Sequence, residues 1–469
     1  MLPSPFPRPP IVDNLVDKPH QNILLFSIED LNDWIEPLGG HPDAITPNLS
    51  RLAKRAAVFT KAYSPAPACS PARTAALFGQ NPWETGVYEN KHKWHHHYPK
   101  GKRLSLIGRM RTAGFETHGL GKVFHVNKPQ FDYEDWDSFP QSNSELFPPI
   151  SRLAKTGKFG PSIDFGAIPD GDDLYDDANT GAMIAQMKRG SQGQFWALGL
   201  YRPHLPFVVP QRFFDMLPDT VANPPGLGQN SFNPTAEAPQ SGLSAAGKAY
   251  ANSRAQFRRI VSRTGEYQDF LKAYLASVAY ADYLLGRVLD HMDETGLWEN
   301  TTLLLWSDHG YQLGEKLAFH KFTLWERALR VPLMIAGPEI AAGRYDEPVS
   351  LIDIAPTLMA VAGQPPVPQF SGQNLLPLLR GETAAMRGYA GSVWTQQSKE
   401  GLAQTALSLR SRTHRYIFYW DGSEELYDHR SDPFEHDNLL AGGTGTARAL
   451  ALREEFMALL PEDMAEPAN

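Results

Sequence analysis

Three continuous apolar runs of strand length constrain the fold of this chain most strongly. They span 22–28 (Asn-Ile-Leu-Leu-Phe-Ser-Ile), 195–201 and 301–306, and none alternates between polar and apolar residues. Strands of this kind are buried on both faces, which is typical of parallel sheets covered by helices. Segments with helical spacing lie between them, the longest over 267–295 and closed by Gly296. The sequence therefore predicts an α/β fold with a large mixed, mostly parallel sheet sandwiched by helices.

A change of composition marks the expected domain boundary. A chain of 469 residues is long for a single core, and the Pro-rich stretch 364–368 interrupts the alternation of strands and helices. We place the boundary slightly beyond it, so that 1–380 form the main domain. Residues 381–469 are then a smaller C-terminal α+β subdomain, with a small antiparallel sheet that includes 406–409 and 416–420 and a final helix ending near Leu460.

Charge and hydropathy exclude several classes of partner. The formal net charge is −8 without a block of like charges, which argues against nucleic acid as a substrate. No apolar stretch approaches the length of a membrane-spanning helix. The N-terminal residues 1–10 are Pro-rich and lack the apolar segment of a secretory signal. We expect an extended arm there and a cytoplasmic location, or a periplasmic one if a leader has been removed.

Acidic side chains directly follow two of the apolar runs. Glu29 and Asp30 come after 22–28, and Asp308 and His309 come after 301–306 and Ser307. In open α/β sheets, ligands bind at the carboxyl ends of the strands. Adjacent carboxylates there suit a hard cation, which needs several oxygen ligands. Taken alone, Asp30 could equally cap a turn, so the metal hypothesis depends on the two pairs meeting.

Cys69 is the only cysteine of the chain and opens an alanine-rich helical segment after a proline-containing loop. A helix N-terminus favours an anion, because its backbone N–H groups are free and its dipole is positive there. Arg73 lies four residues on, on the same helix face. This arrangement suits a nucleophile next to a fixed cation. The alternative is a buried cysteine that acts only as a small hydrophobe.

Further basic and imidazole groups follow other predicted strands. Lys122 and His125 come after the strand predicted at 115–121, and His204 comes after 195–201, where it could act as a general acid. Structural roles at a strand end are the alternative for each of them. The run His95–His97 cannot present three side chains to one metal, because neighbouring residues point in different directions. We expect that run to be a solvated or substrate-facing loop.

The motif Cys69-x-Pro71-x-Arg73, with Gly79 following, resembles the maturation signature of the type I sulfatases of the alkaline phosphatase superfamily. Phe78 departs from that pattern, in which threonine is more common. The segments 203–207 and 307–332 extend the resemblance, and they favour the iduronate-2-sulfatase-like branch. The resemblance implies an alkaline phosphatase-like fold. It also implies that a formylglycine-generating enzyme oxidises Cys69 to formylglycine, whose hydrate is the nucleophile.

The same resemblance assigns roles to the other candidates. It implies that one divalent cation, Ca²⁺ with Mg²⁺ as the alternative, is bound by Glu29, Asp30, oxidised Cys69, Asp308 and His309. Sulfatases commonly have Asp at the position of Glu29. Arg73 and Lys122 would hold the formylglycine hydroxyls, and His125 would hydrogen-bond the hydroxyl that does not bind the metal. His204 and Lys321 would contact the sulfate, with His204 as proton donor to the leaving oxygen.

The implied reaction is the hydrolysis of a sulfate monoester, a small anionic substrate and by resemblance a sulfated sugar. Specificity is expected to reside in the loops 86–100, 132–165 and 218–245, where the sequence shows no clear periodicity. Two alternatives stay open. One is a phosphonate monoester or phosphodiester hydrolase with the same fold and nucleophile, and the other is a catalytically silent binding homologue.

Overall fold

The computed structural model describes most of the chain, in these ranges: 21–92, 94, 104–125, 135–139, 163–171, 174–187, 192–225, 240, 242–253, 266–397, 403–443, 445–465 and 467. The predicted N-terminal arm, the run His95–His97 and most of the loops 132–165 and 218–245 lie outside the described residues. Among the described residues, no helix combines the length and the apolar composition needed to cross a bilayer.

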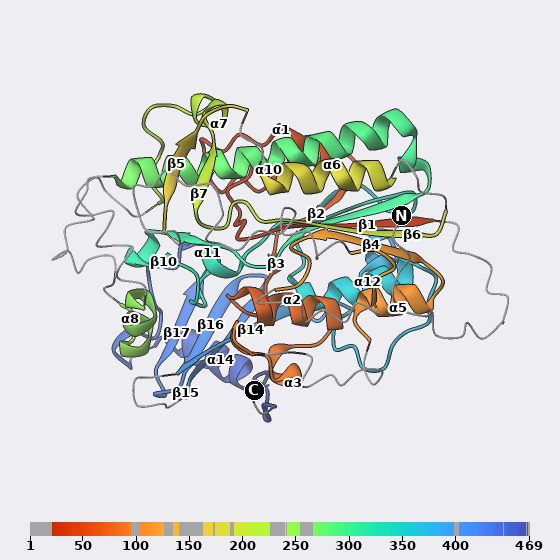
Figure 1. The fold of residues 1–469 in the computed structure, drawn as a ribbon. Helices are drawn as coiled ribbons and strands as arrows, with labels where there is room; N and C mark the ends of the chain where they lie inside the picture. Colours follow the sequence, from red (N-terminus) through yellow and green to blue (C-terminus); the bar gives the residue numbers. More distant parts are fainter. Residues whose placement is uncertain are drawn as a thin grey trace.

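A central seven-stranded sheet forms the middle layer (Figure 1). Its order is β12-β2-β11-β8-β1-β6-β4. The strands are β1 (Asn22–Ile28), β2 (Ala57–Phe59), β4 (Glu116–Gly121), β6 (Gln194–Leu200), β8 (Thr301–Ser307), β11 (Leu333–Ala336) and β12 (Gly343–Tyr345). β4, β6, β1 and β8 are mutually parallel, whereas β11 is antiparallel to both of its neighbours. The predicted mixed, mostly parallel sheet is therefore confirmed.

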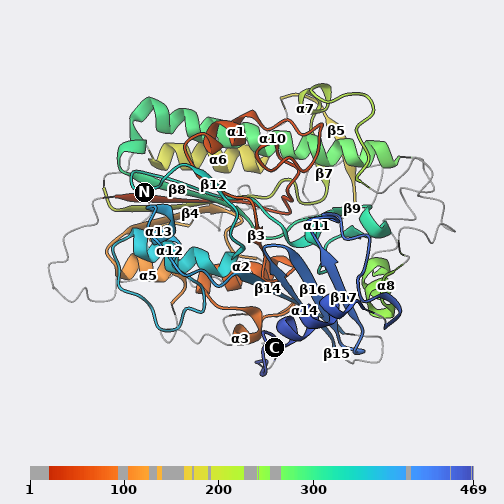
Figure 2. The same ribbon diagram turned by 180° about the vertical axis from the view of Figure 1, so that it is seen from behind.

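Helices cover both faces of this sheet. Figure 1 shows α1 (Pro47–Ala53), α6 (Tyr175–Met187) and α10 (Tyr267–Thr295) on one face. The helices α2 (Cys69–Phe78), α5 (Leu106–Thr112) and α12 (Ile354–Val361) lie on the other, and the view from behind agrees (Figure 2). Both faces of β1 are buried for this reason. Leu24 and Phe26 enter the core beneath α10, and Ile23 and Leu25 enter the core beneath α2.

Short strands of two to four residues and several short helices surround this core. They are β3 (Ala62–Tyr63), β5 (Phe165–Ile168), β7 (Phe207–Pro210), β9 (Gln312–Leu313), β10 (Phe319–His320), β13 (Val349–Ser350), α3 (Pro82–Thr85), α7 (Gln211–Asp215), α8 (Ala245–Asn252), α11 (Glu326–Leu329) and α13 (Leu376–Leu379). The segment before α12 begins with β13 and a short 3-10 turn, and Val349 and Ser350 pair with β3.

The C-terminal part contains a second, antiparallel sheet. Its strands, in order, are β14 (Tyr389–Gln397), β15 (Ala403–Ser411), β16 (His414–Tyr419) and β17 (Glu424–Asp428), and α14 (Ala447–Met457) packs beside them. β14 is tied to the loop before Cys69, because Val393 N donates to Pro65 O at 2.9 Å and Ser392 Oγ donates to Ser64 O at 2.6 Å. The C-terminal sheet therefore contacts the loop that leads to Cys69. The domain division at residue 380 stays a prediction.

Candidate active site

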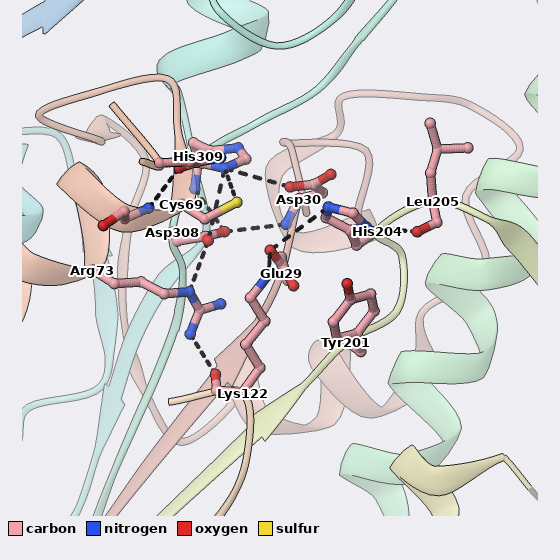
Figure 3. Close-up of polar contacts among 12 residues, drawn as sticks. Glu29, Asp30, Cys69, Arg73, Lys122, Tyr201, His204, Leu205, Asp308 and His309 are labelled. Atoms are coloured by element: carbon pink, nitrogen blue, oxygen red, sulfur yellow. Dashed lines mark hydrogen bonds and ion pairs between the residues drawn. The ribbon is translucent and has the colours of Figure 1, made fainter. Parts of the chain in front are cut away.

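The register of the parallel strands brings distant polar residues to one edge. Ile28, the last residue of β1, is paired with Ser307 of β8 and with Leu200 of β6. The residues that follow these three strands are therefore neighbours at the carboxyl edge, the usual ligand-binding edge of such sheets. They include Glu29, Asp308 and Tyr201, and Figure 3 shows them side by side.

Two glycines allow β4 and β6 to approach closely where Lys122 emerges. Gly121 has a φ of 69°, and a Cβ at Gly199 would lie 2.0 Å from the carbonyl oxygen of Lys122. Lys122 N donates to Gly199 O at 2.8 Å. A larger residue at either position would displace the backbone. The turn therefore fixes Lys122, whose ammonium group contacts Glu29 Oε1.

Cys69 is the first residue of α2, as expected, and is 1% exposed. Asn90 Oδ1 accepts a hydrogen bond from Ser70 N at 2.9 Å and so satisfies one of the free donors at this helix start. The thiol lies 3.1 Å from Lys321 Nζ and 3.3 Å from His309 Nε2. These contacts place the nucleophile candidate between groups that are distant in sequence.

The surroundings of Cys69 favour a negative charge. Burial alone would raise the pKa of the thiol, but Lys321, Lys122 and His309 outweigh it and hold that pKa well below its usual value. Cationic surroundings are what activate cysteines and other nucleophiles in proteins. His125 also adjoins the thiol: burial lowers the pKa of this imidazole, and the contact with Cys69 opposes that effect.

The carboxylates of Asp30 and Glu29 are buried close to Cys69. Lys321 Nζ donates to Asp30 Oδ1 at 2.8 Å, and His309 Nε2 lies 3.4 Å from that oxygen. Burial raises the pKa of both carboxyl groups, well above the usual value for Glu29, although Lys122 and Lys321 oppose this. Asp30 has a φ of 57°, a left-handed conformation that is costly outside glycine and that clusters at functional sites.

Asp308 forms the second half of this acidic group. Its Oδ2 accepts from Arg73 Nε at 2.9 Å, while its Oδ1 accepts from Asp30 N at 3.2 Å. Burial alone would raise its pKa, but Arg73 and His309 outweigh it and lower the pKa. Arg73 also donates through Nη1 to Ser27 Oγ at 3.3 Å and to Val123 O at 2.9 Å. Its Nη2 has no hydrogen-bond partner among the described residues.

The donor set fits a divalent cation. Ligand atoms of Glu29, Asp30, Cys69 and His204 lie within 4.8 Å of one another, and so do those of Cys69, Asp308 and His309. Glu29 Oε2 and Asp30 Oδ2 are buried without a hydrogen-bond partner among the described residues. Buried carboxylate oxygens require compensation by a donor or a cation. These two groups of ligand atoms share Cys69, and their carboxylates and imidazoles can therefore hold a metal ion beside it.

His204 and Tyr201 border the acidic group on the β6 side. His204 Nε2 lies 3.9 Å from Glu29 Oε1, and its Nδ1 lies 2.6 Å from Leu205 O. Burial, together with Lys321 and Lys122, holds the pKa of His204 well below its usual value. The Tyr201 ring lies 4.9 Å from the His204 ring, centroid to centroid, and 4.7 Å from Lys122 Nζ.

The structure thus gathers the residues expected at this site. They are Glu29, Asp30, Cys69, Arg73, Lys122, His125, His204, Asp308, His309 and Lys321. Sequence reasoning missed Ser27, Asn90 and Tyr201. Tyr201 had a usable signal, because it directly follows a buried strand that ends at the ligand-binding edge. Ser27 and Asn90 had none, since their contacts with Lys122, Arg73 and Ser70 are made only by the tertiary fold.

Comparison with known proteins gives the family of the chain. A family model described as Sulfatase matches residues 21–364, and another described as N-sulphoglucosamine sulphohydrolase, C-terminal, matches residues 314–460. A sulfatase of Formosa agariphila is 32% identical over 91% of this chain and 84% of its own length. Choline-sulfatase of Rhizobium meliloti is 28% identical over 90% and 83%, and iduronate 2-sulfatase of Mus musculus is 29% identical over 76% and 73%.

Solved structures share the fold. Phosphonate monoester hydrolase of Agrobacterium radiobacter has a TM-score of 0.73 at 19% identity, covering 94% of this chain and 95% of its own. A structure in complex with its substrate D-glucosamine-2-N,6-O-disulfate has a TM-score of 0.71 at 21% identity, covering 94% and 97%. These likenesses confirm the alkaline phosphatase-like fold, and the sequence matches confirm the resemblance seen in the motifs. The chain therefore belongs to the sulfatase family.

Proposed function

We propose that this protein hydrolyses a sulfate monoester with residue 69 as the nucleophile. One observation carries the proposal: two lysines, an arginine and three buried carboxylates form a connected set of contacts around Cys69. A sulfate monoester is an anion, and its cleavage builds further negative charge on the leaving oxygen. Fixed cations in a site with little water stabilise that charge best.

Three cationic side chains can hold the sulfate group and the nucleophile. Lys321 Nζ, next to the thiol, and Arg73 Nη2, without a partner among the described residues, are available to sulfate oxygens or to a hydroxyl of residue 69. Lys122 is held against Glu29 and adds positive charge nearby. After oxidation to formylglycine, residue 69 would supply a hydrated aldehyde as the nucleophile.

His204 is proposed as the proton donor to the leaving oxygen. It borders the acidic group at Glu29, on the side away from Arg73 (Figure 3). Its lowered pKa comes from burial and from Lys321 and Lys122. An anionic substrate between these groups would raise that pKa again, because opposite charge favours the protonated imidazole.

Ca²⁺ is the proposed metal. Glu29, Asp30, Asp308 and His309 would hold it together with an oxygen of oxidised residue 69. Ca²⁺ accepts six to eight oxygen ligands in flexible geometry, which tolerates the long Glu29 arm better than the strict octahedron of Mg²⁺. When bound, such a cation supplies Lewis-acid stabilisation of negative charge.

A sulfated saccharide is the proposed substrate class. The support comes from relatives, which include iduronate 2-sulfatase and an N-acetylglucosamine-6-O-sulfatase of Bacteroides thetaiotaomicron that is 25% identical over 89% of this chain. Choline-sulfatase is a relative whose substrate is not a sugar. A panel of sulfated mono- and disaccharides with choline sulfate as an added member would separate these classes.

The decisive experiment is a pair of assays on protein co-produced with a formylglycine-generating enzyme. Turnover of an aryl sulfate and of a bis-aryl phosphate is measured in parallel, and the mass of the peptide containing residue 69 is recorded. We expect formylglycine and a preference for the sulfate. A clear preference for the phosphodiester would instead assign phosphodiesterase activity, and an unmodified thiol without turnover would indicate a silent homologue.

Cys69→Ala is the matched variant. Turnover should fall at least about a thousandfold, because the nucleophile is lost. The melting temperature should stay within a few degrees, since only a small buried side chain changes. Activity that survives in this variant would exclude residue 69 as the nucleophile.

A further inference from the structure

Tyr201 is a polar side chain in the site to which neither the sequence motifs nor the proposed chemistry assigns a task. It follows β6 directly, at the edge where Glu29 and Lys122 also emerge. The residue is 7% exposed, so it lines the site without being sealed off from it. Its hydroxyl donates to none of the described residues, whereas Lys321, Lys122 and Arg73 are each paired with a carboxylate.

Three groups pack against the ring of Tyr201. Lys122 Nζ lies over it, the His204 ring meets it edge-on, and the Tyr175 ring meets it edge-on at 5.9 Å. Its backbone is held too, because Asp176 Oδ1 accepts from Tyr201 N at 2.9 Å. A side chain restrained in this way aims its hydroxyl in one direction. Figure 3 shows that direction, toward the space between Glu29 and His204.

The hydroxyl keeps its proton at neutral pH and can donate a hydrogen bond, since burial raises the pKa of Tyr201 to about 12 although Lys122 opposes this. A neutral donor contributes less to an anionic sulfate group than the lysines and Arg73 do. Because the lysines and Arg73 are proposed to hold the sulfate group, we assign this hydroxyl to an oxygen of the leaving group. The space it faces borders His204, the residue proposed to protonate the leaving oxygen, and so belongs to the leaving-group side.

We propose that Tyr201 is a specificity-determining residue whose hydroxyl donates a hydrogen bond to a neutral oxygen substituent next to the ester oxygen of the leaving group. The inference rests on the proposed sulfatase function and deepens it. It names the substrate class as sulfate esters that carry a vicinal hydroxyl, as sugars do and simple aryl sulfates do not. A buried donor left without its acceptor costs binding, which is how such a residue would discriminate.

Tyr201→Phe tests this, because it keeps the ring that contacts Lys122 and His204 and removes only the hydroxyl. Two chromogenic substrates are compared: 4-nitrocatechol sulfate, with a hydroxyl next to the ester, and 4-nitrophenyl sulfate, without one. We expect kcat/KM of the variant to fall about tenfold on the first substrate, which corresponds to one neutral hydrogen bond. On the second substrate kcat/KM should fall less than about threefold. Each value is taken relative to wild type, which cancels the difference in leaving-group acidity.

Tyr175→Phe is the matched control. Its hydroxyl is buried without a partner among the described residues, so its removal should leave both substrates unaffected. An equal loss on both substrates in Tyr201→Phe, or no loss on either, would overturn the inference while leaving the sulfatase function intact. A wild-type protein that turns over neither sulfate would overturn the proposed function and this inference with it.

Discussion

Lys321 Nζ lies 3.1 Å from Cys69 Sγ, although 252 residues separate them along the chain. The same ammonium group donates to Asp30 Oδ1 at 2.8 Å. One buried cation therefore connects the nucleophile position with the acidic group. The segment that carries it is held in place by distant contacts, including the hydrogen bond from Phe322 N to Pro67 O at 3.2 Å.

Lys321→Met should lower kcat/KM by about 100-fold to 1,000-fold, the usual loss when one charge-stabilising donor is removed from an active site. Steady-state kinetics on an aryl sulfate provides the measurement. Lys316→Met is the control, because Lys316 is also buried and lies on the same segment, but its ammonium group contacts Glu435 O and the Trp325 and Tyr427 rings. We expect the control to lose stability and to keep kcat; equal losses of activity would contradict the role of Lys321.

Arg73→Lys should be damaging although it keeps the charge. A lysine cannot contact Asp308, Ser27 and the carbonyl group of Val123 at once, whereas the guanidinium group does. We expect kcat/KM to fall about 100-fold and the free energy of unfolding to fall by about 3 kcal/mol, because Asp308 is left incompletely paired in the interior. Urea unfolding and kinetics are the measurements.

Arg51→Lys is the comparison for that variant. Arg51 pairs with Asp290 at 2.6 Å on the surface, where such pairs are worth about 1 kcal/mol or less. Should Arg73→Lys be as mild as Arg51→Lys, the buried pair with Asp308 would not organise the site.

Metal removal should affect both activity and stability. Without a cation, Glu29, Asp30 and Asp308 repel one another in the interior. At Ca²⁺ a hundredfold above Kd, linkage predicts a gain of about 3 kcal/mol in the free energy of unfolding over the chelated protein. Differential scanning calorimetry with Ca²⁺, Mg²⁺ and a chelator is the test. Asp30→Asn should lose most of this metal-dependent shift, and a shift of unchanged size would remove Asp30 from the ligand set.

Glu435 gives a pH prediction away from the active site. It accepts from Arg415 Nε at 2.6 Å and from Glu326 N at 2.9 Å, and so it joins β16 to α11. Burial alone would raise its pKa, but Arg415 and His429 outweigh it and lower the pKa to about 2. A lowered carboxyl pKa stabilises the fold above the unfolded value of about 4.5, and this stabilisation is lost as the pH falls toward 2.

Glu435→Gln should therefore lower the free energy of unfolding by about 3 kcal/mol at pH 7 and by progressively less below pH 4.5. Chemical unfolding across pH 3 to 7 measures the difference between variant and wild type. Asp437→Asn, an exposed carboxylate on the same segment, should show little change at any pH. A Glu435→Gln effect that does not shrink on acidification would mean that charge is not the cause.

The sequence by itself determined the elements whose signals are local. Continuous apolar runs identified β1, β6 and β8 within one residue, because a strand buried on both faces must be apolar throughout. Helical spacing identified α10 from Tyr267 to Thr295, and the motif around Cys69 identified the start of α2. The acidic and basic candidates were also predictable, because side chains at the carboxyl ends of such strands must meet at one edge.

Only the tertiary structure decided how these groups pair. The antiparallel direction of β11, the approach of β14 to the Cys69 loop and the contact of Lys321 with Cys69 all join segments that local periodicity cannot relate. Tyr201 shows the same limit: its place after β6 was visible in the sequence, but its orientation follows from packing against Lys122, His204 and Tyr175. Hydrophobic pattern fixes which faces are buried, whereas register and side-chain packing, which depend on the whole fold, fix which atoms touch.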